Sequence, residues 1–211
     1  MTQPDPFPGP AYKIHTQRLV IRCMDPADAP MQSIAIEQSL EHLLPWAPWA
    51  KQEPLTLQAR IELLRGWRGD FDLGIDFEYG LFDPTETVFL GCVRLNPHDS
   101  QEMREIGYWI HKDHINKGLA TEASAALTKV AFEIDHVNRV EIHCDPNNLR
   151  SASVPRKLGF THEATLRSRV KDPLGNLHGR MIWTLFVEDY PGSPSSNAEI
   201  QAFDAISRRI I

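Results

Sequence analysis

The sequence REIGYWIHKDHINKGLAT, residues 104–121, decides the fold that we expect for this chain. Its first half alternates like a strand, with three large apolar residues on one face and with Gly107 and Trp109 on the other. A short basic turn follows, and a helix then begins with small residues. The order of strand, turn and helix predicts a ligand site where the strand ends.

The turn at residues 116–120 is predicted to bind an anion. The first N–H groups of a helix lack partners within it and the helix dipole is positive there, so a diphosphate fits at this point. Gly118 allows close approach of the backbone, Ala120 keeps the wall small and Lys117 adds a mobile positive charge. An ordinary helix-capping surface turn is the alternative. The chain has neither a Gly-x-x-x-x-Gly-Lys-Ser/Thr loop nor a Gly-x-Gly-x-x-Gly motif after a predicted strand.

The residues after the turn predict a mixed α/β fold. Ala123, Leu127, Val130 and Ile134 recur at helical spacing and form one buried stripe. The strand RVEIHC follows at residues 139–144. A strand, helix, strand succession of this length predicts a parallel pair with a right-handed crossover.

Other predicted elements flank this unit. A strand from Arg18 precedes one or two helical pieces over residues 25–44, capped by Asp25 or Asp28. After Pro45 and Pro48, a helix over 56–70 leads into antiparallel strands over 77–83 and 88–97.

The last part of the chain predicts a capped helix and a hairpin. Asn148 caps a helix over residues 149–158, which Gly159 ends. Pro155 has no N–H for the carbonyl of Ser151, which predicts a local kink or an exposed carbonyl. Strands over 160–170 and 180–187 then form a hairpin.

Length and composition indicate one domain. The 211 residues can bury a single good core, and we expect a flexible extension over residues 1–10, a domain over 11–190 and a C-terminal extension over 191–211. The last amphipathic piece can dock on the body or on a partner, and a homodimer remains open. The net charge of −6 argues against direct nucleic-acid binding, while an acidic groove that attracts a basic amine or peptide stays open.

Cysteine and histidine usage points to a cytoplasmic protein without a metal site. The odd number of cysteines, three, predicts buried thiols in a reducing compartment. His111 and His114 lack partners at ligand spacing and are predicted to be surface-loop histidines. No apolar run has the length of a membrane span, and the start of the chain lacks the apolar stretch of a secretory signal.

Five segments in order resemble the GNAT acyl-CoA N-acetyltransferases, and more narrowly the branch that acetylates ribosomal-protein N-termini. These segments are RLVIR, IGYWI followed by NKGLATEA, NRVEIHCDPNNLRS and KLGF, and the LPWAPW element and TQRLVIR support the narrower branch. The resemblance covers residues 18–187. It implies a single-domain α/β fold, with a mixed, mostly antiparallel sheet, a central splayed parallel strand pair and flanking helices.

The resemblance implies acetyl-CoA as the co-substrate, with no metal. The family's Q/R-x-x-G-x-G/A turn, which binds the coenzyme A pyrophosphate, aligns with residues 115–120, and Ile115 departs from its first position. Asn116 can restore one side-chain contact. Free main-chain groups of the strand would contact the pantetheine arm, and Asn148 matches the family asparagine that contacts the same arm. The implied coenzyme residues are Trp109, Ile110, His111, Asn116, Lys117, Gly118, Leu119, Ala120, Thr121 and Asn148.

Acetyl transfer to an amine needs an uncharged nucleophile, oxyanion stabilisation and a proton for the thiolate. Glu105 is the preferred base, and Glu141 and His143 are the alternatives. The alternative role for Glu105 is that of an ordinary exposed charge on its strand. Ser151 matches the family's N-x-x-S serine and can protonate the thiolate, or simply cap the helix. A main-chain N–H of residues 109–111 would polarise the thioester carbonyl. Cys144 is expected to be inert packing.

The acceptor is predicted to be the amino terminus of a protein, such as a ribosomal protein. Trp46 and Trp49 would wall the acceptor site beside His143, unless they fill the core. Relatives carry Tyr and Asp in the final hairpin where this chain has Leu177 and Gly179, which favours a small amine as the alternative acceptor. A non-catalytic acyl-CoA-binding module is a third reading, motivated by Ile115 and Pro155.

Overall fold

A mixed sheet forms the centre of the computed structural model, which describes residues 10–97, 102–171 and 176–211. Within these residues the strands are β1 (Lys13–His15), β2 (Val20–Cys23), β3 (Phe77–Phe82), β4 (Phe89–Pro97), β5 (Met103–Ile110), β6 (Arg139–Cys144), β7 (Thr161–Lys171), β8 (Leu177–Phe186) and β9 (Gln201–Phe203). They lie in the order β7-β8-β6-β5-β4-β3-β2-β1-β9. The predicted extension over residues 1–10 lies outside the described part except for its last residue.

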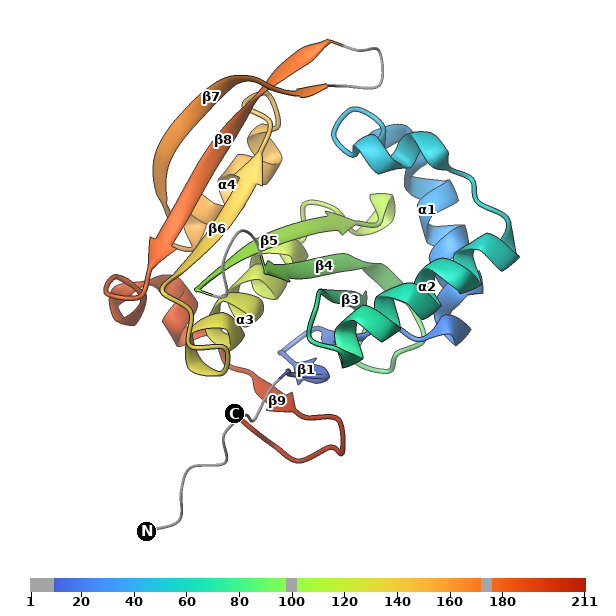
Figure 1. Cartoon of the computed structure of the whole chain (residues 1–211), viewed down its shortest axis with the longest axis horizontal. Coiled ribbons are helices and arrows are strands. Elements are labelled where there is room, and N and C mark those ends of the chain that lie inside the picture. The colour runs from blue at the N-terminus through green and yellow to red at the C-terminus, as the bar shows by residue number, and fades with distance from the viewer. Residues whose placement is uncertain (1–9, 98–101, 172–175) are drawn as a thin grey trace.

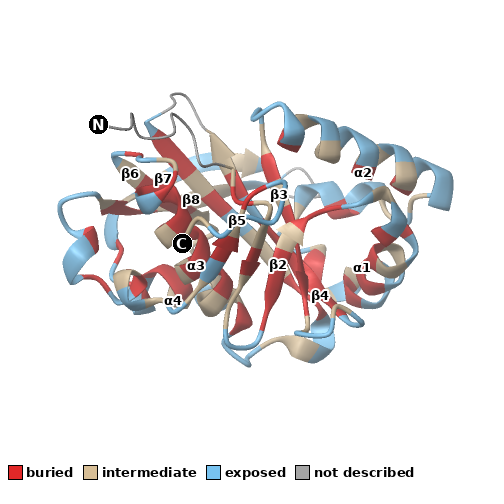
Figure 2. Ribbon diagram, turned by 90° about the horizontal axis from the view of Figure 1, so that it is seen from below, coloured by how far each residue is buried: buried red, intermediate tan, exposed pale blue. Residues whose placement is uncertain are grey.

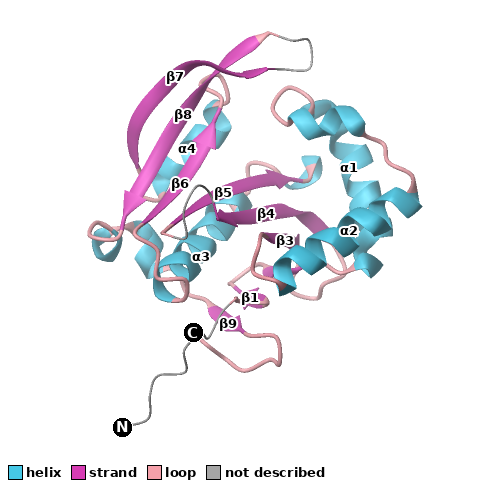
Figure 3. Cartoon of the chain, in the orientation of Figure 1, coloured by secondary structure: helices cyan, strands magenta, loops and turns pink. Residues whose placement is uncertain are grey.

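Four helices cover the two faces of this sheet (Figures 1 and 3). They are α1 (Ala29–Leu43), α2 (Leu57–Asp72), α3 (Leu119–Glu133) and α4 (Leu149–Lys157). α1 packs on β4 and α2 on β3, whereas α3 and α4 pack on the other face, against β4 to β7. Short 3-10 turns connect them at η1 (Pro26–Asp28), η2 (Pro48–Gln52), η3 (Lys112–His114), η4 (Tyr190–Gly192) and η5 (Pro194–Asn197).

The chain is therefore a single α/β domain, and the predicted pairings are confirmed. β3 with β4 and β7 with β8 are antiparallel hairpins, and β5 with β6 is the parallel pair around α3.

Strand alternation divides the core into two clusters. Ile106 and Ile110 of β5 are buried against the α3 stripe, whose four predicted members are at most 6% exposed. Trp109 points to the opposite face and packs against a smaller cluster beneath α1 and α2, which includes Leu64. Figure 2 shows buried strand residues between the two helical layers, with exposed residues on the outer sides of α1 and α2.

The predicted helix signals are confirmed. The Asp25 side chain caps η1 by accepting from the Ala27 N–H, and the Asp25 N–H donates to the Asp28 side chain. The Asn148 side chain accepts from the N–H of Ser151 at the start of α4. Gly159 has φ of +84° just after α4, the left-handed conformation in which glycine avoids a Cβ clash.

Three sequence predictions are wrong in detail. The first strand was expected from Arg18, but β1 precedes it and forms a hairpin with β2. His111 is 7% exposed and bonded to Gln38, so it is not a surface-loop histidine. Cys144, expected to be buried, is only half-buried, because its end of β6 lies beside a cleft.

The C-terminal segment docks on the body of the protein. β9 pairs antiparallel with β1 at the edge of the sheet, and the Ile210 N–H donates to the Ala202 carbonyl at 2.8 Å. The last residues therefore continue the sheet rather than forming a separate helix.

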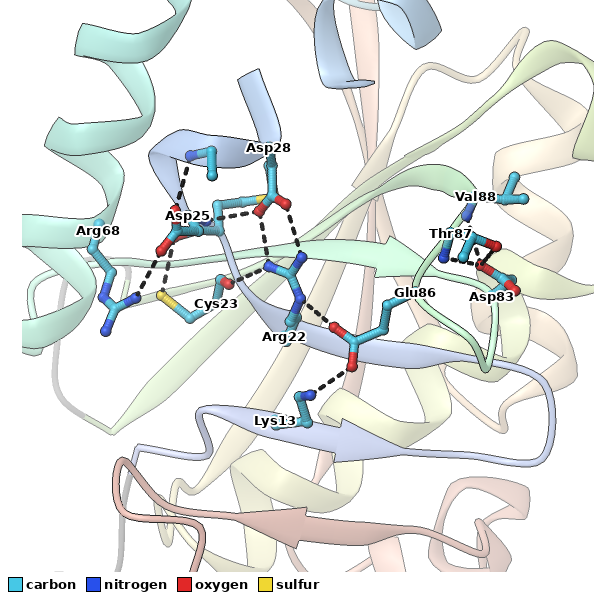
Figure 4. Close-up of polar contacts among 12 residues, drawn as sticks. Lys13, Arg22, Cys23, Asp25, Asp28, Arg68, Asp83, Glu86, Thr87 and Val88 are labelled. Atoms are coloured by element: carbon cyan, nitrogen blue, oxygen red, sulfur yellow. Dashed lines mark hydrogen bonds and ion pairs between the residues drawn. The ribbon is translucent and has the colours of Figure 1, made fainter. Parts of the chain in front are cut away.

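An ionic cluster around Arg22 fixes the N-terminal strands (Figure 4). The Arg22 guanidinium donates to both oxygens of Asp28 at 2.8 Å and to Glu86 at 2.6 Å, and it lies 4.0 Å above the Phe82 ring. Lys13 donates to the other oxygen of Glu86 at 2.6 Å. Burial acts to raise the pKa of Glu86, but the bonds from these two cations outweigh it and lower that pKa.

Replacing Arg22 by methionine is expected to destabilise the protein by about 2–3 kcal/mol, because it leaves two partly buried carboxylates without their shared cation. Urea unfolding followed by circular dichroism measures this difference. Arg65, whose ion pair with Glu62 is solvent-exposed, provides the matched control, and Arg65→Met should cost less than about 0.5 kcal/mol.

The destabilisation should also depend on pH. The pKa of Glu86 is lowered in the folded protein, so its carboxylate contributes stability above the ordinary pKa of a glutamate. This contribution to stability is lost as the pH falls through the folded pKa. The difference between wild type and Arg22→Met should therefore shrink in acid. An equal difference at pH 7 and pH 3 would contradict the assignment.

Candidate functional site

The turn before α3 has the geometry of an anion cradle. Asn116 has φ of +60° and Gly118 has φ of +80°, so two left-handed residues flank Lys117. Such alternation turns successive N–H groups toward one side of the chain. Gly118 is the N-cap of α3 and has no side chain with which to cap it, so the first helical N–H groups are available to a ligand.

Arg18, at the start of the N-terminal strand region, holds this turn from behind. Its guanidinium donates to the Lys117 carbonyl at 2.7 Å and to Glu122 of α3 at 2.6 Å. The Lys117 ammonium donates to the carbonyl of Asp113 at 2.8 Å. The cationic side chains therefore brace the turn, while main-chain N–H groups remain for the anion.

A cleft of about 1030 Å³ runs from this turn across the sheet to α1 and α2. It brings together most of the predicted site residues: Trp46, Trp49, Trp109, Ile110, Asn116, Gly118, Leu119, Ala120, Thr121, His143, Asn148 and Ser151. The side chains of Lys117 and His111 are not among its lining groups. Glu105 lines a smaller adjoining cavity of about 150 Å³, together with Trp46 and His143.

The parallel strands separate where the cleft crosses the sheet. The ladder between β5 and β6 ends at Glu105 with Glu141, while β5 stays on β4 as far as Ile110 and β6 stays on β8 as far as Cys144. Figure 1 shows the two halves of the sheet turning away from each other beyond this point. The peptide groups that would have continued the ladder can bond to a ligand.

Hydrogen-bond alternation identifies which groups face this gap. The His111 N–H donates to the Leu90 carbonyl at 2.8 Å, so it is not free for a ligand. Because bonding direction alternates along an antiparallel strand, Trp109 also bonds toward β4, while the N–H groups of Tyr108 and Ile110 point into the gap. Of residues 109–111, Ile110 is therefore the donor that can polarise a carbonyl there.

Pro155 links α4 to the gap. It lies within α4 and has no N–H for the Ser151 carbonyl, which accepts instead from the Tyr108 hydroxyl at 3.0 Å. The same hydroxyl lies 3.1 Å from Ser151 Oγ. The exposed carbonyl predicted from the sequence is thus present and bonded, and Tyr108 fixes the serine beside the cleft.

Carboxylates and a histidine form a chain at the end of the β5–β6 ladder. His143 Nε2 lies 2.8 Å from Glu141 Oε2, and Arg139 Nε donates to Glu141 Oε1 at 2.8 Å. The hydrogen bond from His143 lowers the pKa of Glu141, although burial acts to raise it. Glu105 Oε2 lies 3.3 Å from His143 Nδ1, without hydrogen-bond geometry.

Two tryptophans stand at the cleft mouth rather than in the core. Trp46 is 44% exposed and Trp49 is 39% exposed, with the Trp49 ring 6.1 Å from that of Trp109. Both side chains line the cleft and neither fills the core. Exposed aromatic rings beside polar groups are typical of ligand sites.

The floor of the cleft is Gly107, which is exposed although it lies in a central strand. A Cβ built there meets no atom within 4 Å. Its cross-strand neighbours on the same face are Arg94 and, beyond it, Glu78. Burial raises the pKa of Glu78 to about 8, so this carboxyl is largely protonated at neutral pH.

Sequence reasoning did not identify Arg18, Tyr108 or Glu78. Tyr108 was assigned to the apolar face of its strand, which is correct, but a buried tyrosine hydroxyl needs a partner, and that requirement was the available signal. A single glutamate in the apolar strand at residues 77–82 was the corresponding signal for Glu78. Arg18 gave no signal, because its partners are about a hundred residues away.

Three further observations concern the part of the chain that the structure describes. There, no group of three or more His, Cys, Asp or Glu side chains could hold a metal ion. No helix of that part is long and apolar enough to cross a membrane. Burial raises the pKa of the Cys144 thiol, which makes it a poor nucleophile.

Comparisons with known proteins agree with this geometry. The sequence profile of the Acetyltransferase (GNAT) domain matches residues 18–161. The chain is 30% identical over 177 residues to the Bacillus subtilis protein YdaF, provisionally described as a ribosomal N-acetyltransferase, covering 83% of this chain and 95% of that one. It is 28% identical to the [Ribosomal protein uS5]-alanine N-acetyltransferase of Escherichia coli, covering 73% and 80%.

Solved structures show the same fold. A probable acetyltransferase superposes with a TM-score of 0.76 at 29% identity, covering 82% of this chain and 96% of that one. The ribosomal L7/L12 alpha-N-protein acetyltransferase RimL in complex with coenzyme A gives 0.74 at 18% identity, covering 81% and 95%.

Proposed function

The chain belongs to the GNAT acetyltransferases, and we propose from this premise that it acetylates the amino terminus of a protein, such as a ribosomal protein, in the cytoplasm. The observation that carries the proposal is that a site fit for a coenzyme lies next to a site fit for an acceptor. The anion cradle and the gap between β5 and β6 fit acetyl-CoA, and an aromatic-walled mouth opens beside Glu105 on the far side of that gap.

The residues present fit the coenzyme. The N–H groups at residues 116–121 would hold the diphosphate, and the gap-facing groups of Tyr108 and Ile110, with Asn148, would bond the pantetheine amides. Bound there, acetyl-CoA supplies the acetyl group as a thioester. The missing Gln or Arg at Ile115 removes a side chain but no main-chain donor, so the cradle remains complete.

Three groups of this chain would then serve the transfer. Ile110 N–H donates to the thioester carbonyl, and Ser151 Oγ, held by Tyr108, can give a proton to the departing thiolate. Glu105, 22% exposed toward the acceptor cavity, accepts a proton from the incoming amine directly or through water. An α-amino group titrates near pH 8, against about 10.4 for lysine, so a carboxylate is sufficient for an N-terminal acceptor.

A small amine is the second candidate acceptor. The cavity beside Glu105 measures about 150 Å³, which suits a small molecule as well as one terminal residue. Gly179, at the hairpin position where relatives carry a side chain, has little room for one, because a Cβ would lie 3.0 Å from the Leu166 carbonyl oxygen and 3.2 Å from Pro146.

A thiol-release assay with acetyl-CoA tests the proposal. Peptides with N-terminal alanine or serine should be turned over, and polyamines, amino acids and aminoglycosides should compete poorly. Preferential turnover of a small amine would favour the second candidate. Tight coenzyme A binding in calorimetry without turnover of any acceptor would instead indicate a non-catalytic module.

Replacing Glu105 by glutamine is expected to lower kcat about 30-fold at pH 7. The effect lies at the low end for a general base, because an α-amino acceptor is already partly neutral. Coenzyme A binding should be unchanged, since Glu105 lines the acceptor cavity. As the pH rises and the amine loses its proton unaided, the variant should recover, and a deficit that is constant with pH would argue against Glu105 as the base.

A further inference from the structure

His143 has one nitrogen that the resting structure leaves without a hydrogen bond. The imidazole is buried, with a side-chain exposure of 10%, between two carboxylates on the two parallel strands. Nε2 is bonded to Glu141, whereas Nδ1 is a buried atom without a hydrogen-bond partner in the part of the chain that the structure describes. A buried polar atom without a partner is unfavourable, so this arrangement calls for an explanation.

Glu141 determines which nitrogen carries the proton. Its pKa is lowered, so it is a carboxylate at neutral pH and can only accept hydrogen bonds. His143 Nε2 must therefore donate to it. In the neutral imidazole Nδ1 then presents a lone pair, and it lies 3.3 Å from Glu105 Oε2.

Two acceptors at this separation leave a gap that one proton can bridge once the partly exposed Glu105 side chain turns toward Nδ1. With the gap empty, the lone pairs of Nδ1 and Oε2 repel each other and no hydrogen bond forms. With one proton in it, Oε2–H donates to Nδ1 or Nδ1–H donates to Oε2, and the orphaned atom gains its partner. Uptake of one proton therefore removes the unfavourable contact.

Only Glu105 can bring that proton from outside. Glu105 lines the acceptor cavity and is partly exposed, whereas Nδ1 is inaccessible behind it. An acceptor ammonium in the cavity would meet the carboxylate first. The charged groups that line the same cavity from the hairpin side and the end of β6 are Asp145, which is paired with His178 at 2.7 Å, Lys171 and Arg180.

We propose that Glu105 and His143 bind one proton as a unit, and that His143, oriented by Glu141, is a positioning residue that makes Glu105 a more effective base. The inference rests on the proposed function, in which Glu105 receives the proton of the acceptor amine. In this proposal the base is a unit of three residues on β5 and β6 and not one carboxylate. Arg139 donates to Glu141 at the end of the unit that is remote from Glu105.

The proton balance of the step is as follows. An N–H bond of the acceptor ammonium breaks, its proton moves to Glu105 Oε2, and its electron pair stays on the nitrogen, which attacks the thioester carbonyl. The proton on Glu105 is stabilised by Nδ1 and later returns to water through the cavity. The C–S bond breaks, and the thiolate takes the second proton that the nitrogen loses, by way of Ser151.

A double-mutant cycle in the full-length protein tests the inference. Glu141→Gln should move the acidic limb of the kcat/KM profile to lower pH by about one unit, because the unit loses a neighbouring negative charge and binds its proton less tightly. His143→Phe should lower kcat about 10-fold at pH 7. Adding Glu141→Gln to His143→Phe should then change nothing further, since Glu141 acts through the imidazole.

Controls separate this role from a structural one. Glu62→Gln, on the exposed side of α2, should leave the profile unchanged. Coenzyme A affinity and the thermal midpoint should remain close to wild type in all variants. A uniform loss at every pH in Glu141→Gln, or additive effects in the double variant, would overturn the inference.

Nitrogen NMR of His143 provides a readout that needs no substrate. The neutral imidazole should carry its proton on Nε2, and Glu105→Gln should change the chemical shift of Nδ1, the atom that shares the proton with Glu105. A neutral imidazole protonated on Nδ1 instead of Nε2, or an Nδ1 signal that Glu105→Gln leaves unchanged, would overturn the inference. If the wild type acetylates no acceptor, the proposed function fails, while these NMR results still decide whether the three residues are coupled.

Discussion

Replacing Gly107 by leucine is expected to lower kcat/KM for the acceptor roughly 1,000-fold while coenzyme A affinity changes less than about 3-fold. The cleft crosses the central strand at this residue, and the open floor there exists because the residue has no side chain. A leucine would stand where the acceptor must lie to reach the gap between β5 and β6. A displacement of about 1 Å already costs an aligned reaction about 100-fold, and exclusion costs more.

The fold should tolerate this substitution. A Cβ at position 107 meets no atom within 4 Å, and the backbone there is ordinary strand. Replacing a strand glycine usually stabilises a protein slightly, by about 0.4–1 kcal/mol, because it restricts the unfolded chain. Loss of activity together with an unchanged or raised thermal midpoint would thus identify a steric block.

Gly107→Ala provides the matched control. Its methyl group fills little of the groove, so kcat/KM should fall less than about 5-fold. Steady-state kinetics with a peptide acceptor, with calorimetry for coenzyme A, measure both variants. If Gly107→Leu weakens coenzyme A as strongly as it weakens the acceptor, the floor belongs to the coenzyme and the acceptor enters elsewhere.

Most of the fold was predictable because its signals are local. Alternation in β5, the helical stripe of α3 and the caps at Asp25 and Asn148 each depend on residues close together in the sequence. The strands that were missed, β1 and β9, are only three residues long and are defined by their pairing with each other and with β2. Such short strands carry little periodicity of their own.

The candidate site was predictable where it consists of backbone. The anion-binding turn around Gly118 was expected from its place between a strand and a helix, and the separation of β5 from β6 was expected from the resemblance to the family. Contacts between side chains distant in the sequence did not follow. The proximity of Glu105 and His143 depends on the register of a parallel pair, which the alternating pattern leaves open by two residues in either direction.

Replacing Asn116 by aspartate is expected to weaken coenzyme A binding about 100-fold at low salt. Asparagine and aspartate have nearly the same shape, and both tolerate the φ of +60° at this position, so the turn should keep its conformation. The new carboxylate would lie beside the bound diphosphate. At a separation of about 5 Å and an effective dielectric constant of about 20, two like charges repel by roughly 3 kcal/mol, a factor of about 100.

Two comparisons show whether charge is the cause. Asn116→Gly keeps the left-handed conformation and removes only the amide, so it measures the side-chain contact expected of Asn116, and affinity should fall no more than about 5-fold. Raising the salt from about 0.05 to 0.5 M should recover part of the loss in the aspartate variant, because exposed charges are screened, and little in the glycine variant.

Calorimetric titration with coenzyme A and with its dephosphorylated pantetheine fragment separates the diphosphate from the rest of the ligand. If Asn116→Asp binds both as the wild type does, the diphosphate does not lie at this turn, and the anion cradle would have to be sought elsewhere along the cleft.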